Sequence, residues 1–221
     1  MSATVIVDNR NYLTMRQRIA REIKRDNLDQ YICDAIGDAI YYYQQMRFFF
    51  SQNTDSSTVL VQGVNTYTPP DDLIEIDELT MTIAPPGGGQ SYVLPLEPHD
   101  ISWILERDLI TPPEQGQPTD YAFFDNKVRV YITPDGQNAY TLNYYYTAII
   151  PPPVNDNDAG YWMTDAELMI RTFAKGLLYG SVLRNLKQAE AEMLISRQAF
   201  LQLSRQNNAL LSTGETKPTK F

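Results

Sequence analysis

The side chains best suited to catalysis or cation binding lie in one short acidic stretch, at Asp71, Asp72, Glu75, Asp77 and Glu78. A pair of carboxylates can cleave a glycosidic bond when one is protonated and the other is ionised. Carboxylate oxygens also bind hard cations such as Ca²⁺, but this stretch lacks the alternating acidic spacing and the central glycine of a calcium-binding loop. A solvated turn that leads into a strand is therefore the simpler interpretation.

The other reactive side chains occur singly. His99 is the only histidine and Cys33 the only cysteine, so one chain can form neither a multi-histidine metal site nor a disulfide. His99 stands between Pro98 and Asp100 in an expected turn, which argues against a role in a Ser-His-Asp triad. Gly87–Gly89 lacks the lysine and the helix of a phosphate-binding loop. We expect no catalytic residue, no metal and no cofactor.

Both ends of the chain show apolar residues at helical spacing. A first helix is expected at residues 12–24, and a second carries an apolar stripe from Ile32 to Phe50. After the proline run at 151–153, one helix begins near Thr164 and another covers about 187–211. Two sequence pairs have the spacing of helix-capping boxes, Asn27 with Gln30 and Thr164 with Glu167. Gly176 and Gly180 lie four residues apart and leave room for the close approach of another element.

Between these ends the apolar pattern alternates, as in strands. Turn-forming sequences such as Pro85–Gly89 and Thr133–Gly136 separate short alternating segments, which predicts an antiparallel β sandwich or a small barrel. A short helix is expected from Pro98 to Leu109. The expected strands cover residues 58–68, 79–84, 92–96, 121–124, 128–132 and 140–147.

The order of helices, strands and helices predicts an α+β fold in which the two helical ends form one domain. We expect a mainly helical domain from residues 1–57 and 148–212. An antiparallel β domain, residues 58–147, is inserted between them. Residues 213–221 form an extended C-terminal tail.

Charge follows the same division. Residues 1–25 and 166–221 each carry a net charge of +4 (six basic against two acidic residues, and eight against four), while residues 26–165 carry −17 (four against twenty-one). Ordinary solvated surface is one interpretation. The other is that the two ends come together and face an acidic partner. A net charge of −9 lacks the dominant basic field of a free DNA-binding protein.

Tyrosine is abundant, with 15 residues that include the runs Tyr41–Tyr43 and Tyr144–Tyr146. Three consecutive residues on a strand place rings on both faces. The second face is covered either by another layer of the domain or by a neighbouring subunit, and both can hold at once. Tyr42, Phe49 and Tyr145 are the candidates for contacts between subunits.

Several motifs follow one another along the chain in a recognisable order. The N-terminal helix contains Ala35-Ile36 and Ala39-Ile40, and the proline run, Trp162 and the long C-terminal helix pair come last. Between them stand Pro69-Pro70-Asp71-Asp72-Leu73-Ile74-Glu75-Ile76, Gly116-x-Pro118-x-x-Tyr121-Ala122, Lys127-Val128-Arg129-Val130-Tyr131, Thr133-Pro134-Asp135-Gly136 and Tyr140-Thr141-Leu142-x-Tyr144-Tyr145. This ordered set, which covers nearly the whole chain, resembles the head-to-tail adaptor (connector) proteins of tailed phages.

The resemblance implies a structural, non-enzymatic protein of the virion neck, assembled in the host cytoplasm. Its copies would form a dodecameric ring that joins the portal protein to a tail or nozzle protein and continues the DNA channel. Non-specific contact with packaged DNA is compatible with this role. We expect no membrane partner, because no apolar run approaches the roughly 20 residues that cross a bilayer and no signal peptide is recognisable.

Two other functions stay open. A peptidoglycan-cleaving enzyme would use the Asp71–Glu78 stretch and would lose turnover when Asp72 or Glu75 is replaced. A tail β module that binds carbohydrate would consist mainly of strands, whereas more than a third of this chain is expected to be helical.

The C-terminal tail supplies the candidates for an interface with the portal or neck, Lys217, Lys220 and Phe221. It is polar and short, so it cannot form a core of its own. We expect it to dock on the portal in an extended form, with Phe221 in a pocket and the lysines against acidic groups. The alternative is a solvated tail held by a neighbouring copy.

Overall fold

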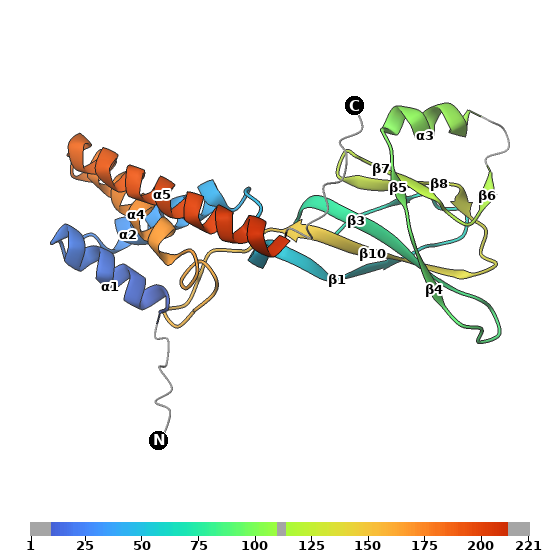
Figure 1. Cartoon of the computed structure of the whole chain (residues 1–221), viewed down its shortest axis with the longest axis horizontal. Helices are drawn as coiled ribbons and strands as arrows, with labels where there is room; N and C mark the ends of the chain where they lie inside the picture. Colours follow the sequence, from blue (N-terminus) through green and yellow to red (C-terminus); the bar gives the residue numbers. More distant parts are fainter. Residues whose placement is uncertain (1–9, 110–113, 212–221) are drawn as a thin grey trace, which may run out of the picture. The chain divides into compact units, whose positions relative to one another are not determined.

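The computed structural model describes residues 10–109 and 114–211, and it confirms the α+β class (Figure 1). The chain divides into two compact units. A helical unit combines the residues up to Phe50 with those from Ile150 onward, and a β unit comprises Ser51–Ile149. The first boundary lies seven residues before the expected one at 57/58, and the second lies two residues after the expected one at 147/148.

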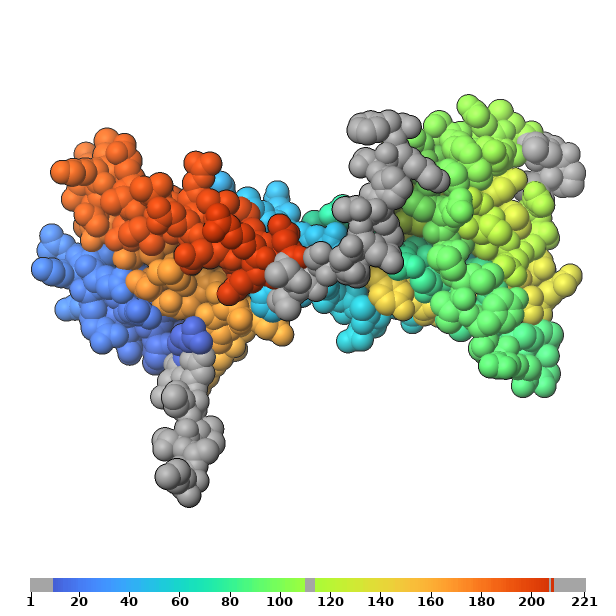
Figure 2. Space-filling model, viewed as in Figure 1, coloured from blue at the N-terminus to red at the C-terminus, as the bar shows by residue number. Residues whose placement is uncertain are grey.

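The helical unit contains α1 (Tyr12–Ile23), α2 (Asp29–Tyr43), α4 (Glu167–Leu177) and α5 (Leu186–Leu211), with a π-helical turn, η2 (Leu178–Val182), between the last two. Helix α4 packs against α2 on one side and α5 on another. Helix α5, orange to red, forms an exposed outer side of this unit (Figure 2).

One core holds both ends of the chain together. Buried side chains of α1 and α2, such as Ile19 and Ile36, share this core with Ile170 of α4 and Leu203 of α5, and Phe173 packs against it. At Gly176 an added Cβ would lie 3.0 Å from Met193 of α5. Gly176 therefore permits the close approach of α4 and α5, as the spacing of the two glycines predicted. The group that lies against Gly176 is the Met193 side chain rather than the backbone of α5.

The helix starts differ from the expected capping boxes. Helix α1 has the reciprocal box, in which the Asn11 side chain accepts a hydrogen bond from Thr14 N (2.9 Å) and Thr14 Oγ1 accepts one from Asn11 N (2.9 Å). The boxes expected at Asn27 and Thr164 are wrong, because α2 begins after Leu28 and α4 after Ala166, neither with a side-chain cap. Spacing alone could not reveal that Glu167 is held by ion pairs.

Helix α2 ends at Tyr43, earlier than the stripe to Phe50 predicted. A short 3₁₀ turn, η1 (Phe49–Ser51), follows it. Phe48 and Phe50 stack with their ring centroids 5.0 Å apart, and both rings meet Trp162 edge-on. These aromatic residues are buried by the loop before α4 rather than by a continued helix, which is why their spacing resembled a helical stripe.

The β unit consists of two four-stranded sheets, which share one core, and a separate two-stranded pair. The sheet orders are β1-β10-β3-β4, β2-β8-β7-β5 and β6-β9, and a short helix, α3 (Ile101–Asp108), lies beside β7. The strands are β1 (Gln52–Val59), β2 (Thr66–Tyr67), β3 (Leu73–Ala84), β4 (Tyr92–Pro95), β5 (Glu97–Pro98), β6 (Gln115–Gly116), β7 (Asp120–Phe124), β8 (Lys127–Tyr131), β9 (Thr133–Pro134) and β10 (Ala139–Ala148).

Pairing in the β unit is antiparallel except in two short places. Strand β5 pairs in parallel with β7, and β6 with β9. The structure also corrects the first expected strand, 58–68. Strand β1 begins at Gln52, opposite Thr147 of β10, and has ended before β2. Its sequence is polar because it is an edge strand, so apolar alternation could not detect it.

Ile36→Ala should destabilise the helical unit by about 2–5 kcal/mol, because Ile36 is fully buried where both chain ends meet and its truncation leaves a cavity. Urea unfolding followed by the helical circular dichroism signal measures this. Tyr41→Ala on the same helix, where the side chain is 57% exposed, should cost less than about 0.5 kcal/mol. Equal losses in the two variants would contradict the shared core.

Candidate functional site

A buried ion-pair network joins the first and last helices of the helical unit. Glu22 of α1 meets Arg171 of α4 (Nη1 to Oε2, 2.6 Å) and Lys175 of α4 (Nζ to Oε2, 2.7 Å). Arg171 Nε also donates to Glu167 (2.7 Å), and Lys175 contacts Glu192 of α5 (2.9 Å). We call these five residues the ion-pair network. Its two cations are more than nine-tenths buried, so each needs its carboxylate partners.

The arginines of α1 are also neutralised within the unit. Arg16 pairs with Asp29 and with Asp156, each at 2.6 Å. Arg18 pairs with Glu22 and Glu167. Much of the excess basic charge at the chain ends is thus balanced by carboxylates in the same unit. The pairing of these two arginines weakens the interpretation in which the basic ends face an acidic partner, but other basic residues such as Arg25 and Arg205 are exposed.

Glu22 is the most informative titrating group of the network. Burial disfavours its ionised form, but the hydrogen bond from Lys175 and the charges of Arg171 and Lys175 outweigh burial, so the pKa of Glu22 lies below its ordinary value. The stabilisation that the ionised carboxylate provides is therefore present above the ordinary pKa and is lost as the pH falls through the lowered one.

Helix α5 exposes an apolar row that the sequence analysis missed. Leu186, Leu194 and Leu201 are 69%, 58% and 48% exposed, and their spacings of eight and seven residues place them along one face. Glu190 and Arg197 lie on the same face and are exposed. The opposite face, with Ser196 and Leu203, is buried in the core. We call Leu186, Leu194 and Leu201 the leucine row. In the sequence, only the spacing of these leucines could have indicated the row. A helix with apolar residues on two faces gives a weak periodic signal.

The candidates for subunit contacts have different environments. Tyr42 is 56% exposed and stacks on Phe173, with 4.7 Å between the ring centroids. Tyr145 is 41% exposed on β10, while the adjacent Tyr144 and Tyr146 are buried in the β core. Phe49 is half-buried and packs edge-on against Phe50. Two of the three candidates thus present substantial aromatic surface to solvent.

The acidic stretch runs along β3 and the turn before it. Asp72 accepts a hydrogen bond from the Tyr146 hydroxyl (2.9 Å), and burial together with this bond raises the pKa of Tyr146 to about 12. Glu78 lies opposite Tyr145, and a bulge in the pairing falls between this pair and Ile76. Glu75 lines a cleft of about 310 Å³ with His99 and Tyr121. Within the described parts of the chain, no three carboxylates of this stretch form a cation-binding group.

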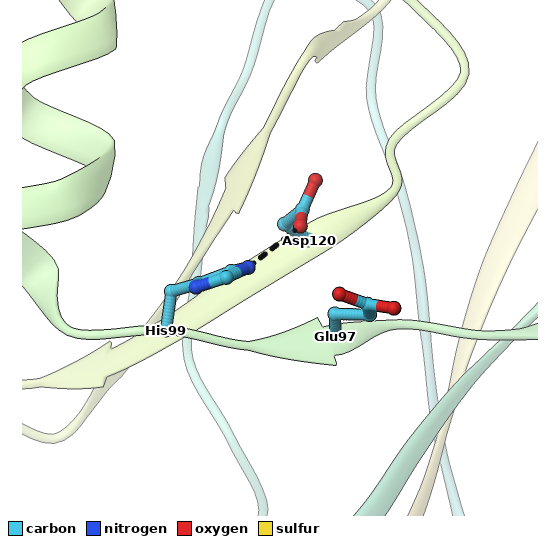
Figure 3. A group of neighbouring side chains, drawn as sticks. All are labelled: Glu97, His99 and Asp120. Atoms are coloured by element: carbon cyan, nitrogen blue, oxygen red, sulfur yellow. Dashed lines mark hydrogen bonds and ion pairs between the residues drawn. The ribbon is translucent and has the colours of Figure 1, made fainter.

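A different cluster brings metal-ligating side chains together. Glu97 and His99 come from β5 and the residue after it, and Asp120 begins β7 (Figure 3). Their nearest ligand atoms all lie within 4.8 Å of one another. His99 Nε2 is 2.9 Å from Asp120 Oδ1. The sequence placed His99 in a turn, and the spacing of Glu97 and Asp120 along the chain gave no sign of their proximity.

Lys217, Lys220 and Phe221 lie outside the residues that the structure describes. No helix among the described residues is both long enough and apolar enough to cross a membrane.

Comparison with family models places the chain among the phage adaptor proteins. The model of the SU10 adaptor protein family matches residues 10–217, which include both units, so the chain belongs to that family. The resemblance inferred from the ordered motifs is thereby confirmed. No curated protein matches the sequence.

Glu22→Gln should lower the free energy of unfolding by about 1–3 kcal/mol at pH 7, because it weakens charge-assisted hydrogen bonds to two buried cations. The variant should also lose less stability than the wild type as the pH falls below 4.5, the ordinary pKa of this carboxyl. Urea titrations at several pH values test both effects. Glu190→Gln, on the exposed face of α5, is the control and should alter neither. An unchanged acid dependence in Glu22→Gln would refute the role of the network.

Proposed function

We propose that this protein is a structural head-to-tail adaptor of a tailed phage, whose copies form a dodecameric ring between the portal and a tail or nozzle protein. The observation that carries the proposal is the family match over residues 10–217. The match extends through the helical unit and the β unit, so the inference concerns the architecture of the whole chain. In this role the ring continues the DNA channel of the neck, and contact with packaged DNA is non-specific.

The exposed apolar surface supports contact between copies. A ring subunit needs two different surfaces that fit each other around the axis. The leucine row supplies one of them, with Glu190 and Arg197 on the same face to set the register of a neighbouring helix. Tyr42 and Tyr145 add large aromatic area of the kind that is enriched in interfaces. We propose a second copy of the chain as the partner of the leucine row.

The distribution of the carboxylates supports a structural role over a catalytic one. In the acidic stretch, Asp72 is engaged by the Tyr146 hydroxyl and Glu78 faces Tyr145 across the sheet. The stretch runs along the turn before β3 and the strand itself, and among the described residues no three of its carboxylates form a cation-binding group.

Leu194→Asp and Leu201→Asp should each reduce the number of copies bound to portal-bearing heads by at least tenfold, because a carboxylate in the interface would be desolvated without a partner. Sedimentation of heads with the purified protein, followed by quantification of the bound chain, measures this. Gln202→Asp adds the same charge one residue along α5, where the side chain is also exposed, and should bind as the wild type does. Wild-type binding by both leucine variants would exclude this surface from the ring.

Deletion of residues 214–221 tests the proposed docking of the tail on the portal. The deletion removes Lys217, Lys220 and Phe221, and we expect attachment to portal-bearing heads to fall while the circular dichroism spectrum is unchanged. Phe221→Ala alone should reproduce most of the loss if the aromatic ring is the anchor. Unchanged attachment of the deleted protein would eliminate the docking of the tail and leave the ring proposal intact.

A further inference from the structure

We propose that Glu97, His99 and Asp120 form a binding site for one divalent transition-metal ion, with zinc as the best-fitting ion. The proposal concerns the β unit and is independent of the ring. Glu97 pairs with Asp120 across the parallel strands β5 and β7, so their side chains point to the same side of the sheet. His99, two residues after Glu97, points to that side as well (Figure 3).

The backbone holds this register on both sides of the cluster. Glu97 N donates to Thr119 O (3.1 Å), and His99 N donates to Tyr121 O (2.8 Å). The two bonds enclose Asp120, so the three donors belong to one short stretch of paired backbone. A site built on strands holds its ligands more precisely than one built on loops.

The imidazole ring is held in place by its neighbours. It stacks on the indole of Trp103 in α3, with the ring centroids 3.8 Å apart and the planes 2° from parallel. The guanidinium carbon of Arg107, Cζ, lies 3.5 Å from the centroid of the same indole. Two groups this close to one centroid must occupy opposite faces of the ring. The indole therefore separates the guanidinium charge from His99, and Nε2 is left aimed at Asp120.

The charge around the cluster favours a cation. Two of its three members are carboxylates, and Glu75 lines the adjacent cleft with His99. Arg129, one of the two cations on the neighbouring strand β8, is paired with Asp108. Asp120 Oδ2 accepts a hydrogen bond from Thr119 Oγ1 (2.5 Å), which orients the carboxylate in the way that outer partners orient metal ligands.

One imidazole nitrogen and two carboxylate oxygens suit zinc, which binds such ligands at about 2.0–2.2 Å and completes its shell with water. Calcium and magnesium prefer oxygen ligands throughout. The ligand atoms span up to 4.8 Å, and the exposed side chain of Glu97 can rotate to close this distance. A bound ion would replace the His99–Asp120 hydrogen bond and fix the two-residue strand β5 to β7. This would also stabilise the segment that leads from β5 into α3.

The test is isothermal titration of the untagged, chelator-treated full-length protein with zinc chloride, with thermal unfolding measured in parallel. We expect one ion per chain and a higher unfolding temperature of the β unit with zinc, and no such change with magnesium. Glu97→Gln, His99→Gln and Asp120→Asn should each weaken binding at least tenfold. The matched control, Glu106→Gln, removes an exposed carboxylate from α3 and should bind zinc normally.

Glu97→Gln decides between a metal site and a purely structural His99–Asp120 pair, because Glu97 is exposed and its amide should leave the fold intact. Tenfold weaker binding in this variant, with an unchanged circular dichroism spectrum, supports the three-ligand site. The proposal would be overturned by wild-type affinity in Glu97→Gln or by binding only at millimolar zinc. It would also be overturned if zinc binding were unaffected in all three variants. The last result would assign the zinc to another group, such as Cys33.

Discussion

The alignment of the helices in the helical unit depends on the largely buried ion-pair network that ties the first helix of the chain to the last two. Glu22 on α1 holds two cations of α4, and one of these cations reaches Glu192 on α5. Since α1 and α4 are separated in sequence by the entire β unit, their relative position must be set by contacts between them. A purely apolar interface would tolerate several helix registers, whereas a misaligned register would leave Arg171 or Lys175 buried without a carboxylate. We infer that the network specifies this register more than it adds stability.

This internal pairing changes how the charge distribution of the sequence is understood. The basic chain ends suggested an acidic partner, yet Arg16 and Arg18 are already paired with carboxylates of the same unit. Besides charged side chains, the helical unit exposes apolar and aromatic surface that is available to a partner, including the leucine row and Tyr42. For an adaptor such a surface has an advantage, because association through apolar contacts depends little on ionic strength.

The sequence predicted those parts of the molecule that follow a simple period. The helices at residues 12–24 and 187–211 were located to within a residue or two, and β4, β7, β8 and β10 nearly as well. Most of strand β1 was missed, because this edge strand has a polar sequence. The end of α2 was misplaced because Phe48 and Phe50 are buried by a distant loop that holds Trp162. Tertiary contacts of this kind leave no local pattern.

The candidate sites were less predictable than the fold. The acidic stretch was conspicuous in sequence, but among the described residues no three of its carboxylates gather into a cation-binding group. Glu97, His99 and Asp120 were inconspicuous, because α3 separates Asp120 from the other two in sequence. A short parallel pairing of β5 with β7 brings them together. The leucine row was hidden for the opposite reason. Its residues have ordinary helical spacing, and only the placement of Ser196 and Leu203 in the core shows which face of α5 stays exposed.

A reconstruction of the phage neck along its axis would show directly whether copies of this chain form a ring and which surfaces join them. We expect a closed ring of copies of this chain, each with its helical and β units resolved and with the leucine row of α5 at the boundary between neighbouring copies. One or a few copies per particle would contradict the ring. A ring in which the leucine row faces solvent would contradict the proposed interface.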